Sequence, residues 1–264
     1  MRRRRRNLLT RTVPLVTVLV ALAVSVLWWT HRDHPTSLTT TTPVVLGHRP
    51  PLEQTSRGDA SRRRAGLDID TSAHSTSDPS SIWVVVNKTH PIHPLDFRPD
   101  IAIVRGYQVA TAAAEPLGRL MDDGDRAGLG LKIASAFRSY DYQVAVHGDL
   151  VASEGQVAAD KISARPGYSE HQTGLAVDLI TPDEPGCDLD QCFAGTAAGS
   201  WLRENAWRYG FVVRYTAADR AITGYQPEPW HLRYVGRDLA AAMHASGTAT
   251  LEQVFGISGG DYPR

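Results

Sequence analysis

An uncharged, largely apolar segment near the start of the chain, residues 12–29, most constrains how this protein can be organised. It follows arginines at positions 2–6 and 11, and it ends in Trp28 and Trp29. About 20 apolar residues span a bilayer, so this segment is just long enough for one crossing. Basic flanks stay in the cytoplasm, and tryptophans favour the membrane interface. We therefore predict a cytoplasmic basic tail over residues 1–11 and a transmembrane anchor over residues 12–29.

A secretory signal peptide has a similar basic start and apolar middle. The residues after Trp29 are Thr-His-Arg-Asp, which lack the small-x-small pattern of a cleavage site. We therefore favour an anchor, or an uncleaved signal, over a cleaved one. Either interpretation exports the rest of the chain. The expected location is the cell membrane, with a single crossing and the C-terminal domain on the extracytoplasmic side.

The charge distribution argues against a nucleic-acid partner. The whole chain has 28 Lys and Arg against 28 Asp and Glu, but its first 33 residues contain seven arginines and one acid. The remaining residues carry 21 basic and 27 acidic side chains, a net charge of −6. Such an acidic part binds polyanions poorly. We predict no nucleic-acid partner, and no feature predicts a protein partner.

Two regions of different composition follow the predicted anchor. Residues 30–80 are rich in Thr, Ser, Pro and Arg without apolar periodicity, which is typical of a disordered tether. Residues 81–264 have the texture of one folded domain. Its predicted strands cover residues 82–86, 131–137, 175–180, 211–215 and 231–235, and its predicted helices residues 116–127, 140–154, 201–209, 237–245 and a last one entered through Thr250. Because the elements lack regular βαβ alternation, we predict an α+β fold, in which helices pack against a small antiparallel sheet.

The chain has two cysteines, Cys187 and Cys192, separated by four residues. Outside the membrane, a pair this close is most simply a disulfide that closes a small loop. Two free thiols are the alternative. A metal pair is disfavoured because two ligands without partners do not make a zinc site.

Two of the ten histidines occur beside carboxylates, and they suggest a catalytic metal. His171 lies seven residues before Asp178, and His231 lies three residues after Glu228. Ligands from His171, Asp178 and His231 would leave the fourth position of a tetrahedral zinc open for water. Glu228 could then take a proton from that water and return it to a leaving group. The spacing alone does not decide the matter, since an Asp beside a strand is usually a turn or surface carboxylate.

The surrounding sequence carries a much more specific signal. Residues 169–178 have the pattern S-x-H-x-x-G-x-A-x-D, and residues 228–231 have the pattern E-x-W-H. Together they resemble the VanY-like D-alanyl-D-alanine carboxypeptidases. Further similar segments occur in the same order at residues 86–91, 136–143, 163–167 and 221–225, so that the resemblance covers roughly residues 82–255. One departure is Pro227, where relatives often carry an aromatic residue, which affects the expected pocket rim.

The resemblance implies a zinc peptidase that acts on peptidoglycan stem peptides, with the zinc site in a cleft on the sheet. Carried over by position, it makes His171, Asp178 and His231 the zinc ligands and Glu228 the catalytic base. It also points to Arg138, Gln143 and Ser169 as substrate contacts. A guanidinium such as that of Arg138 suits a terminal carboxylate because it forms two parallel charge-assisted hydrogen bonds. A structural ion pair is the alternative role for Arg138.

Several functional alternatives stay open at this point. Trp230 either forms a wall of the substrate pocket or belongs to the core. The expected reaction is removal of the C-terminal D-alanine from pentapeptide stems. The same machinery would serve an L,D-carboxypeptidase or an endopeptidase on peptidoglycan peptides, and a non-catalytic wall-binding module is a further alternative. Serine chemistry is disfavoured, because no lysine stands three residues after a serine and the G-x-S-x-G match at residues 256–260 has no downstream histidine.

Overall fold

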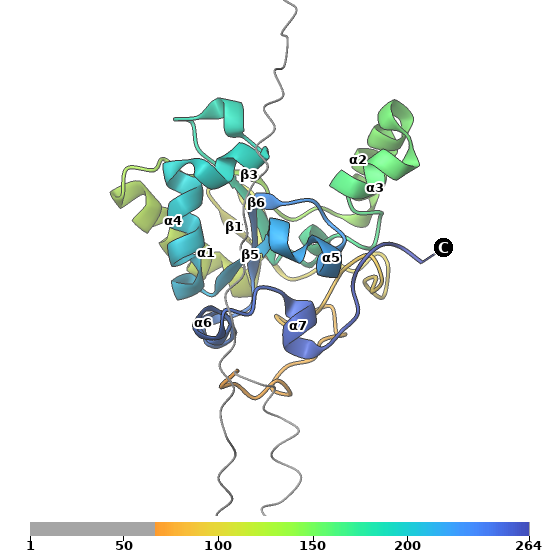
Figure 1. Cartoon of the computed structure of the whole chain (residues 1–264), viewed down its shortest axis with the longest axis horizontal. Coiled ribbons are helices and arrows are strands. Elements are labelled where there is room, and N and C mark those ends of the chain that lie inside the picture. The colour runs from red at the N-terminus through yellow and green to blue at the C-terminus, as the bar shows by residue number, and fades with distance from the viewer. Residues whose placement is uncertain (1–66, 264) are drawn as a thin grey trace, which may run out of the picture. The chain divides into compact units, whose positions relative to one another are not determined.

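The structure is a computed structural model that describes residues 67–263 (Figure 1). The predicted tail and anchor, and the predicted tether up to residue 66, lie outside this range. Four strands form an antiparallel sheet in the order β3-β4-β6-β5. They are β3 (Lys132–Ser135), β4 (Ala176–Ile180), β5 (Phe211–Tyr215) and β6 (Glu228–Tyr234). The two central strands, β4 and β6, therefore lie side by side although about fifty residues separate them.

Helices of very different length surround this sheet. The α-helices are α1 (Thr111–Arg126), α2 (Tyr140–Glu154), α3 (Gln156–Ile162), α4 (Ala197–Asn205), α5 (Arg220–Thr223), α6 (Arg237–Ser246) and α7 (Leu251–Phe255). Short 3-10 turns are η1 (Glu170–Thr173), η2 (Pro185–Cys187), η3 (Gln191–Gly195), η4 (Ala206–Tyr209) and η5 (Ala217–Asp219). The α+β class predicted from the sequence is confirmed.

A second, two-stranded sheet was not predicted. It is a hairpin of β1 (Ile101–Val104) and β2 (Tyr107–Ala110), paired from Ile101–Ala110 to Val104–Tyr107. Its two turn residues, Arg105 and Gly106, have φ values of 49° and 91°. Positive φ at both central positions is the pattern of the tight hairpin turns that match the twist of the strands.

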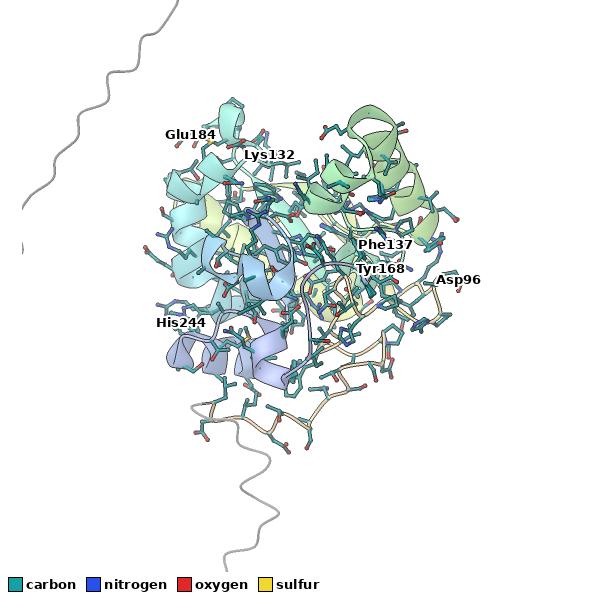
Figure 2. The ribbon with its side chains drawn as sticks, turned by 45° about the vertical axis from the view of Figure 1, so that its right-hand side comes forward. Asp96, Lys132, Phe137, Tyr168, Glu184 and His244 are labelled. Carbon is teal, nitrogen blue, oxygen red and sulfur yellow. A yellow bond between two sulfur atoms is a disulfide. The ribbon has the colours of Figure 1, made fainter. Side chains whose placement is uncertain are left out.

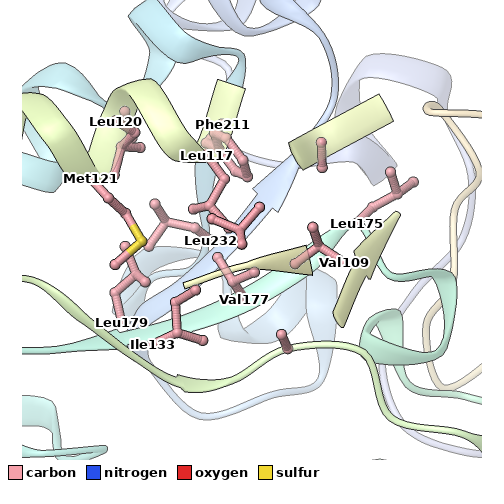
Figure 3. Packing of buried hydrophobic residues seen from close by; sticks show 14 of the residues in the cluster. Val109, Leu117, Leu120, Met121, Ile133, Leu175, Val177, Leu179, Phe211 and Leu232 are labelled. Carbon is pink, nitrogen blue, oxygen red and sulfur yellow. The ribbon is translucent and has the colours of Figure 1, made fainter. Parts of the chain in front are cut away.

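The main core fills the space between α1 and the sheet (Figure 3). From α1 it receives Leu117, Leu120 and Met121, all fully buried. The sheet contributes the buried side chains of Ile133, Val177, Leu179, Phe211 and Leu232. Because these come from all four strands of the sheet, burying them fixes the register that also positions the polar side chains on the strands.

A second core lies under α6 and α7, and residues 82–86 run between the two cores. Val84 and Val86 belong to the main core, whereas Trp83 and Val85 belong to the second. We predicted a strand here, and that prediction was wrong. Both faces are buried, but the carbonyls of Ile82 and Val84 accept hydrogen bonds from the guanidinium of Arg233 instead of from a neighbouring strand.

The packed structure also extends further toward the N-terminus than the boundary we predicted at residue 81. Leu67 is buried in the second core beside Trp83. His74 meets the Trp83 ring edge-on, with 4.6 Å between the ring centroids. Within residues 67–263, no helix combines the length and apolar character that a membrane crossing requires.

Candidate metal and peptidase site

Strand pairing places the first two predicted ligands next to each other. Asp178 on β4 is the register partner of His231 on β6, so both side chains project from the same face of the sheet. The Asp178 Oδ1 atom lies 3.2 Å from His231 Nδ1. Both residues are buried, at 6% and 3% exposure. The sheet core therefore determines the separation of these two groups.

His171 reaches the same point from η1, the turn just before β4. Ser169 precedes this turn and its Oγ accepts a hydrogen bond from the His171 N–H. Gly174 ends the turn with φ of 68°, where a Cβ atom would lie 2.7 Å from the Ala110 nitrogen, so glycine is required. The His171 Nε2 atom lies 3.2 Å from Asp178 Oδ2. The three predicted ligands are thus brought together.

The geometry of this triad fits a zinc ion. Each residue offers one ligand atom, and these atoms lie within 4.8 Å of one another. The His171 Nδ1–H donates to the Ala136 carbonyl at 2.8 Å, which leaves Nε2 free to bind metal. Among the described residues, the buried Asp178 Oδ1 has no hydrogen-bond partner of good geometry. A metal ion bound to this carboxylate oxygen would satisfy it.

The electrostatics of the triad without metal show how strongly its members interact. Burial, with the nearby Arg138 charge, lowers the pKa of His171 to about 4. Burial alone would raise the pKa of Asp178, but His171 and His231 hold it well below its ordinary value. Burial would lower the pKa of His231, yet the neighbouring carboxylates of Asp178 and Glu170 raise it to about 9. The pocket therefore already stabilises an anionic aspartate facing a positive charge.

Glu228 lies beside the triad and has the properties of a proton acceptor. It is the first residue of β6, and its Oε2 lies 3.7 Å from His231 Nδ1. Burial raises its pKa to about 7, and the Asp178 charge contributes in the same direction. A carboxyl group whose pKa lies near the operating pH can both accept and return a proton.

The triad and Glu228 open into a cavity of about 440 Å³. Three of the predicted substrate contacts, Arg138, Ser169 and Trp230, also line it. Trp230 is half-buried and packs against the main core as well, so it lies at the boundary between core and cavity. Arg138 Nη2 lies 3.9 Å from Asp178 Oδ2, and among the described residues its buried Nε has no partner. The Arg138 side chain is 20% exposed and lines the cavity, so its guanidinium can contact a ligand there.

Gln143 differs from the expectation of a substrate contact. It is 1% exposed and is not among the residues that line the cavity. Its Oε1 accepts a hydrogen bond from Arg138 Nη1 at 3.1 Å, while its Nε2 donates to Ser163 Oγ and the Ala164 carbonyl. Gln143 therefore orients the Arg138 guanidinium from the buried side of the cavity wall.

Glu170 is a residue whose role the sequence did not reveal. Its Oε2 lies 3.1 Å from His231 Nε2, which identifies Nε2–H as the donor and leaves Nδ1 free for metal. Arg214 Nε and Arg233 Nη1 donate to Glu170 Oε1 at 3.0 and 2.8 Å. Burial alone would raise the pKa of Glu170, but the two arginines hold it well below its ordinary value. Glu170 is therefore a buried anion that orients a metal ligand.

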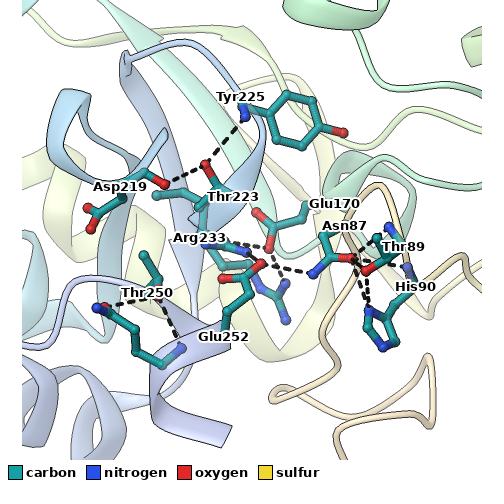
Figure 4. A network of polar contacts seen from close by, with 12 residues as sticks. Asn87, Thr89, His90, Glu170, Asp219, Thr223, Tyr225, Arg233, Thr250 and Glu252 are labelled. Carbon is teal, nitrogen blue, oxygen red and sulfur yellow. Dashed lines mark hydrogen bonds and ion pairs between the residues drawn. The ribbon is translucent and has the colours of Figure 1, made fainter. Parts of the chain in front are cut away.

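The polar network around Glu170 extends to both ends of the described domain (Figure 4). Arg214 Nη2 also donates to Glu252 Oε1 at 2.7 Å, and Asn87 Nδ2 donates to the same oxygen at 3.0 Å. Asn87 lies near the start of the domain, and Glu252 lies on α7. No local pattern in the sequence links these positions, because Asn87 and Glu252 are 165 residues apart.

The predicted disulfide is present in the structure. Cys187 and Cys192 are bonded, with 5.3 Å between their Cα atoms. The Asp190 side chain caps the following turn by accepting from the Cys192 N–H at 2.9 Å. Three of the four residues inside this loop, Leu189, Asp190 and Gln191, line the catalytic cavity.

The family model described as VanY, D-alanyl-D-alanine carboxypeptidase, matches residues 106–237. The chain belongs to this family. The VanY family is a zinc metallopeptidase family, so the protein is a carboxypeptidase and zinc is its cofactor. The VanY-matched region contains the triad, Glu228 and Arg138.

Comparisons with individual proteins agree with the VanY assignment. The protein YodJ of Bacillus subtilis (strain 168) is 35% identical over 67% of this chain and 68% of its own. The LD-carboxypeptidase LdcB, solved for its peptidoglycan recognition, matches with a TM-score of 0.62 and 34% identity over 68% of this chain and 88% of its own. A mutant of the vancomycin resistance D,D-pentapeptidase VanY, from a VanB-type resistance cassette and solved with Zn(II), matches with a TM-score of 0.57 and 31% identity over 65% of this chain and 97% of its own.

Proposed function

We propose that this VanY-family carboxypeptidase, which acts on peptidoglycan peptides, hydrolyses the terminal D-Ala–D-Ala bond of pentapeptide stems and releases D-alanine. The observation that carries the proposal is Arg138, whose guanidinium faces the same cavity as Glu228 and the triad. A cation beside the reacting centre recognises a free terminal carboxylate, which an exopeptidase substrate has and an internal peptide bond lacks.

The side chains have separable roles in this reaction. Arg138, held by Gln143, binds the terminal carboxylate and places the last peptide bond beside the triad. His171, Asp178 and His231 hold zinc, and Glu170 fixes the orientation of His231. When bound there, zinc supplies Lewis acidity toward the carbonyl and lowers the pKa of water. Glu228 accepts the proton of the attacking water and transfers it to the amine of the departing D-alanine.

The test of this mechanism is Glu228→Gln. This variant removes the proton acceptor but none of the metal ligands. We expect it to bind zinc like the wild type while losing at least about 100-fold in kcat, the lower end of what a general base contributes. D-alanine release and bound zinc are measured on the same purified sample. Retained turnover would sink the assigned role of Glu228.

A second candidate reaction is removal of D-alanine from tetrapeptide stems. The likeness to the LD-carboxypeptidase LdcB, at 34% identity, favours it. Both reactions need the same triad, base and carboxylate-binding arginine, so they differ in what precedes the last residue. Incubation with defined penta- and tetrapeptide stems, followed by mass spectrometry, separates the two. Loss of one alanine from the pentapeptide alone supports the first proposal.

We also propose that residues 12–29 anchor the enzyme in the membrane and that the catalytic domain faces the wall. The arginine-rich start and the two tryptophans of the sequence support this proposal. Protease added to intact spheroplasts should then remove the domain. Protection of the domain until the membrane is broken would contradict this orientation.

A further inference from the structure

The loop closed by Cys187 and Cys192 lies at the catalytic cavity. It follows β4, which carries Asp178, and it contributes Leu189, Asp190 and Gln191 to the wall of the catalytic cavity. Figure 2 shows the segment that contains Glu184, just before this loop, on one side of the domain and the α2–α3 pair on the other. The view of Figure 1 agrees.

Leu189, inside this loop, has a left-handed backbone conformation that is unfavourable for leucine. Its φ is 53°, and Arg105 is the only other non-glycine residue with positive φ among residues 67–263. Left-handed backbone is disfavoured for leucine, and such strain persists where the surroundings impose it. Leu189 lies inside the disulfide ring, in a turn that the Asp190 N–H closes by donating to the Cys187 carbonyl at 3.2 Å. The leucine side chain nevertheless stays 48% exposed.

The opposite part of the cavity wall carries aliphatic side chains, as Leu189 does on the loop side. Val146 and Leu150 of α2 and Ile162 of α3 line it, and Ile162 is 50% exposed. The catalytic floor, in contrast, is polar and charged, with Arg138, Glu228 and the triad. A ligand that fills the cavity therefore meets ionic groups at its reacting end and aliphatic surface above it.

We propose that the disulfide-closed loop, through Leu189, is a specificity-determining rim that binds an aliphatic part of the substrate on the amino side of the scissile bond. The inference rests on the proposed exopeptidase function, because Arg138 then occupies the carboxyl end and all further substrate lies on the amino side. Beyond the penultimate alanine, a stem peptide offers the methylene chain of its diamino acid to such a rim. Burying the exposed half of a leucine against them increases affinity about three- to tenfold.

The test uses full-length, zinc-loaded protein with Leu189→Asn, because asparagine tolerates the left-handed backbone but removes the apolar side chain. Leu95→Asn is the matched control, since Leu95 is 43% exposed and lies outside the cavity lining. KM and kcat are measured with a stem pentapeptide and with N-acetyl-D-Ala–D-Ala, which lacks the diamino acid and the residues before it. In parallel, calorimetry gives the Kd of the pentapeptide for Glu228→Gln protein, with and without Leu189→Asn.

We expect Leu189→Asn to raise the pentapeptide KM and Kd about three- to tenfold, with kcat and the minimal substrate unaffected. Replacing both Cys187 and Cys192 by serine should act in the same direction, and Leu95→Asn should change nothing. An unchanged pentapeptide Kd in Leu189→Asn, or equal effects on both substrates, would refute the proposed role of Leu189. If Leu189→Asn weakens pentapeptide binding but the wild type releases no D-alanine, the proposed reaction is refuted while the proposed role of Leu189 in binding is supported.

Discussion

Replacement of Glu170 by glutamine should weaken zinc binding although Glu170 is not a zinc ligand. Its carboxylate accepts from His231 Nε2 at 3.1 Å and from Arg233 at 2.8 Å, and it is fully buried. A glutamine side chain keeps the shape but loses the charge and one of the two acceptor oxygens. Loss of such a partner of a metal-binding histidine costs about 10- to 100-fold in affinity. This corresponds to about 1.4 to 2.7 kcal/mol of zinc-binding free energy.

The same change should also destabilise the fold, so the measurement needs a matched control. Removing one partner of a buried ion pair costs about 3–5 kcal/mol, and glutamine, which keeps one acceptor, should lie near the lower end. Glu252→Gln is the control, because Glu252 binds the same Arg214 at 2.7 Å and is also buried but does not touch His231. For Glu252→Gln we expect a loss of stability comparable to that of Glu170→Gln, with unchanged zinc affinity.

Zinc affinity is measured by competition with a chromophoric chelator, and stability by urea unfolding of the metal-free proteins. The expected result is a selective effect: both variants lose stability, and only Glu170→Gln loses zinc affinity. Equal weakening of zinc binding in both variants would refute the reasoning, because it would show that the affinity follows general destabilisation rather than the orientation of His231.

Three further predictions concern the carboxylate site, pH dependence and the core. Arg138→Lys should reduce kcat/KM for D-alanine release about 10- to 100-fold, because lysine cannot form paired hydrogen bonds with a carboxylate; an unchanged value would assign Arg138 a structural role. In metal-free protein, burial raises the folded pKa of Glu228 from an ordinary 4.5 to about 7, so the unfolded state loses its proton first and stability should fall as pH rises from about 4.5 to about 7. Thermal unfolding across this window should show a smaller fall in Glu228→Gln, and identical profiles would contradict the shift. Leu202→Ala in α4, where the side chain is fully buried, should lower the free energy of unfolding by about 2–5 kcal/mol in urea titrations, whereas Leu189→Ala should cost far less.

Where the sequence carried local signals, the secondary structure followed from it. The helix predicted over residues 140–154 is α2 with the same bounds. Its start is visible in Ser139, whose side chain accepts from the Tyr142 N–H, and its end in Gly155 at φ 82°. The triad was equally predictable, because a family pattern marks all three of its positions.

The errors arose where local signals conflict with packing. We expected Pro116 in the first turn of its helix, but α1 begins at Thr111 and includes Pro116 in its interior. A run of alanines at residues 112–114 extends the helix toward the N-terminus, and the proline leaves one carbonyl without its usual donor. Residues 82–86 look like a strand because they are a run of aromatic and β-branched residues. Both faces of this run are buried, however, and a guanidinium takes the place of a neighbouring strand.

The role of Glu170 was hidden for a different reason. A glutamate beside a histidine has no distinctive spacing, and its partners Arg214 and Arg233 lie 44 and 63 residues away. Only the sheet brings them together, because β5 and β6 are neighbours. Long-range ion pairs of this kind cannot be predicted from one sequence without its fold.

The network that links Asn87, Arg214 and Glu252 has a consequence for how the enzyme matures. A ribosome produces the chain from its N-terminus, so the zinc ligands emerge before α7 does. Until Glu252 arrives, Arg214 is a cation that would have to be buried with only the Glu170 carboxylate, which also serves Arg233 and His231. The last short helix thus completes the charge balance beneath the metal site, and a nascent chain acquires a fully organised catalytic centre only when nearly all of the domain has been synthesised.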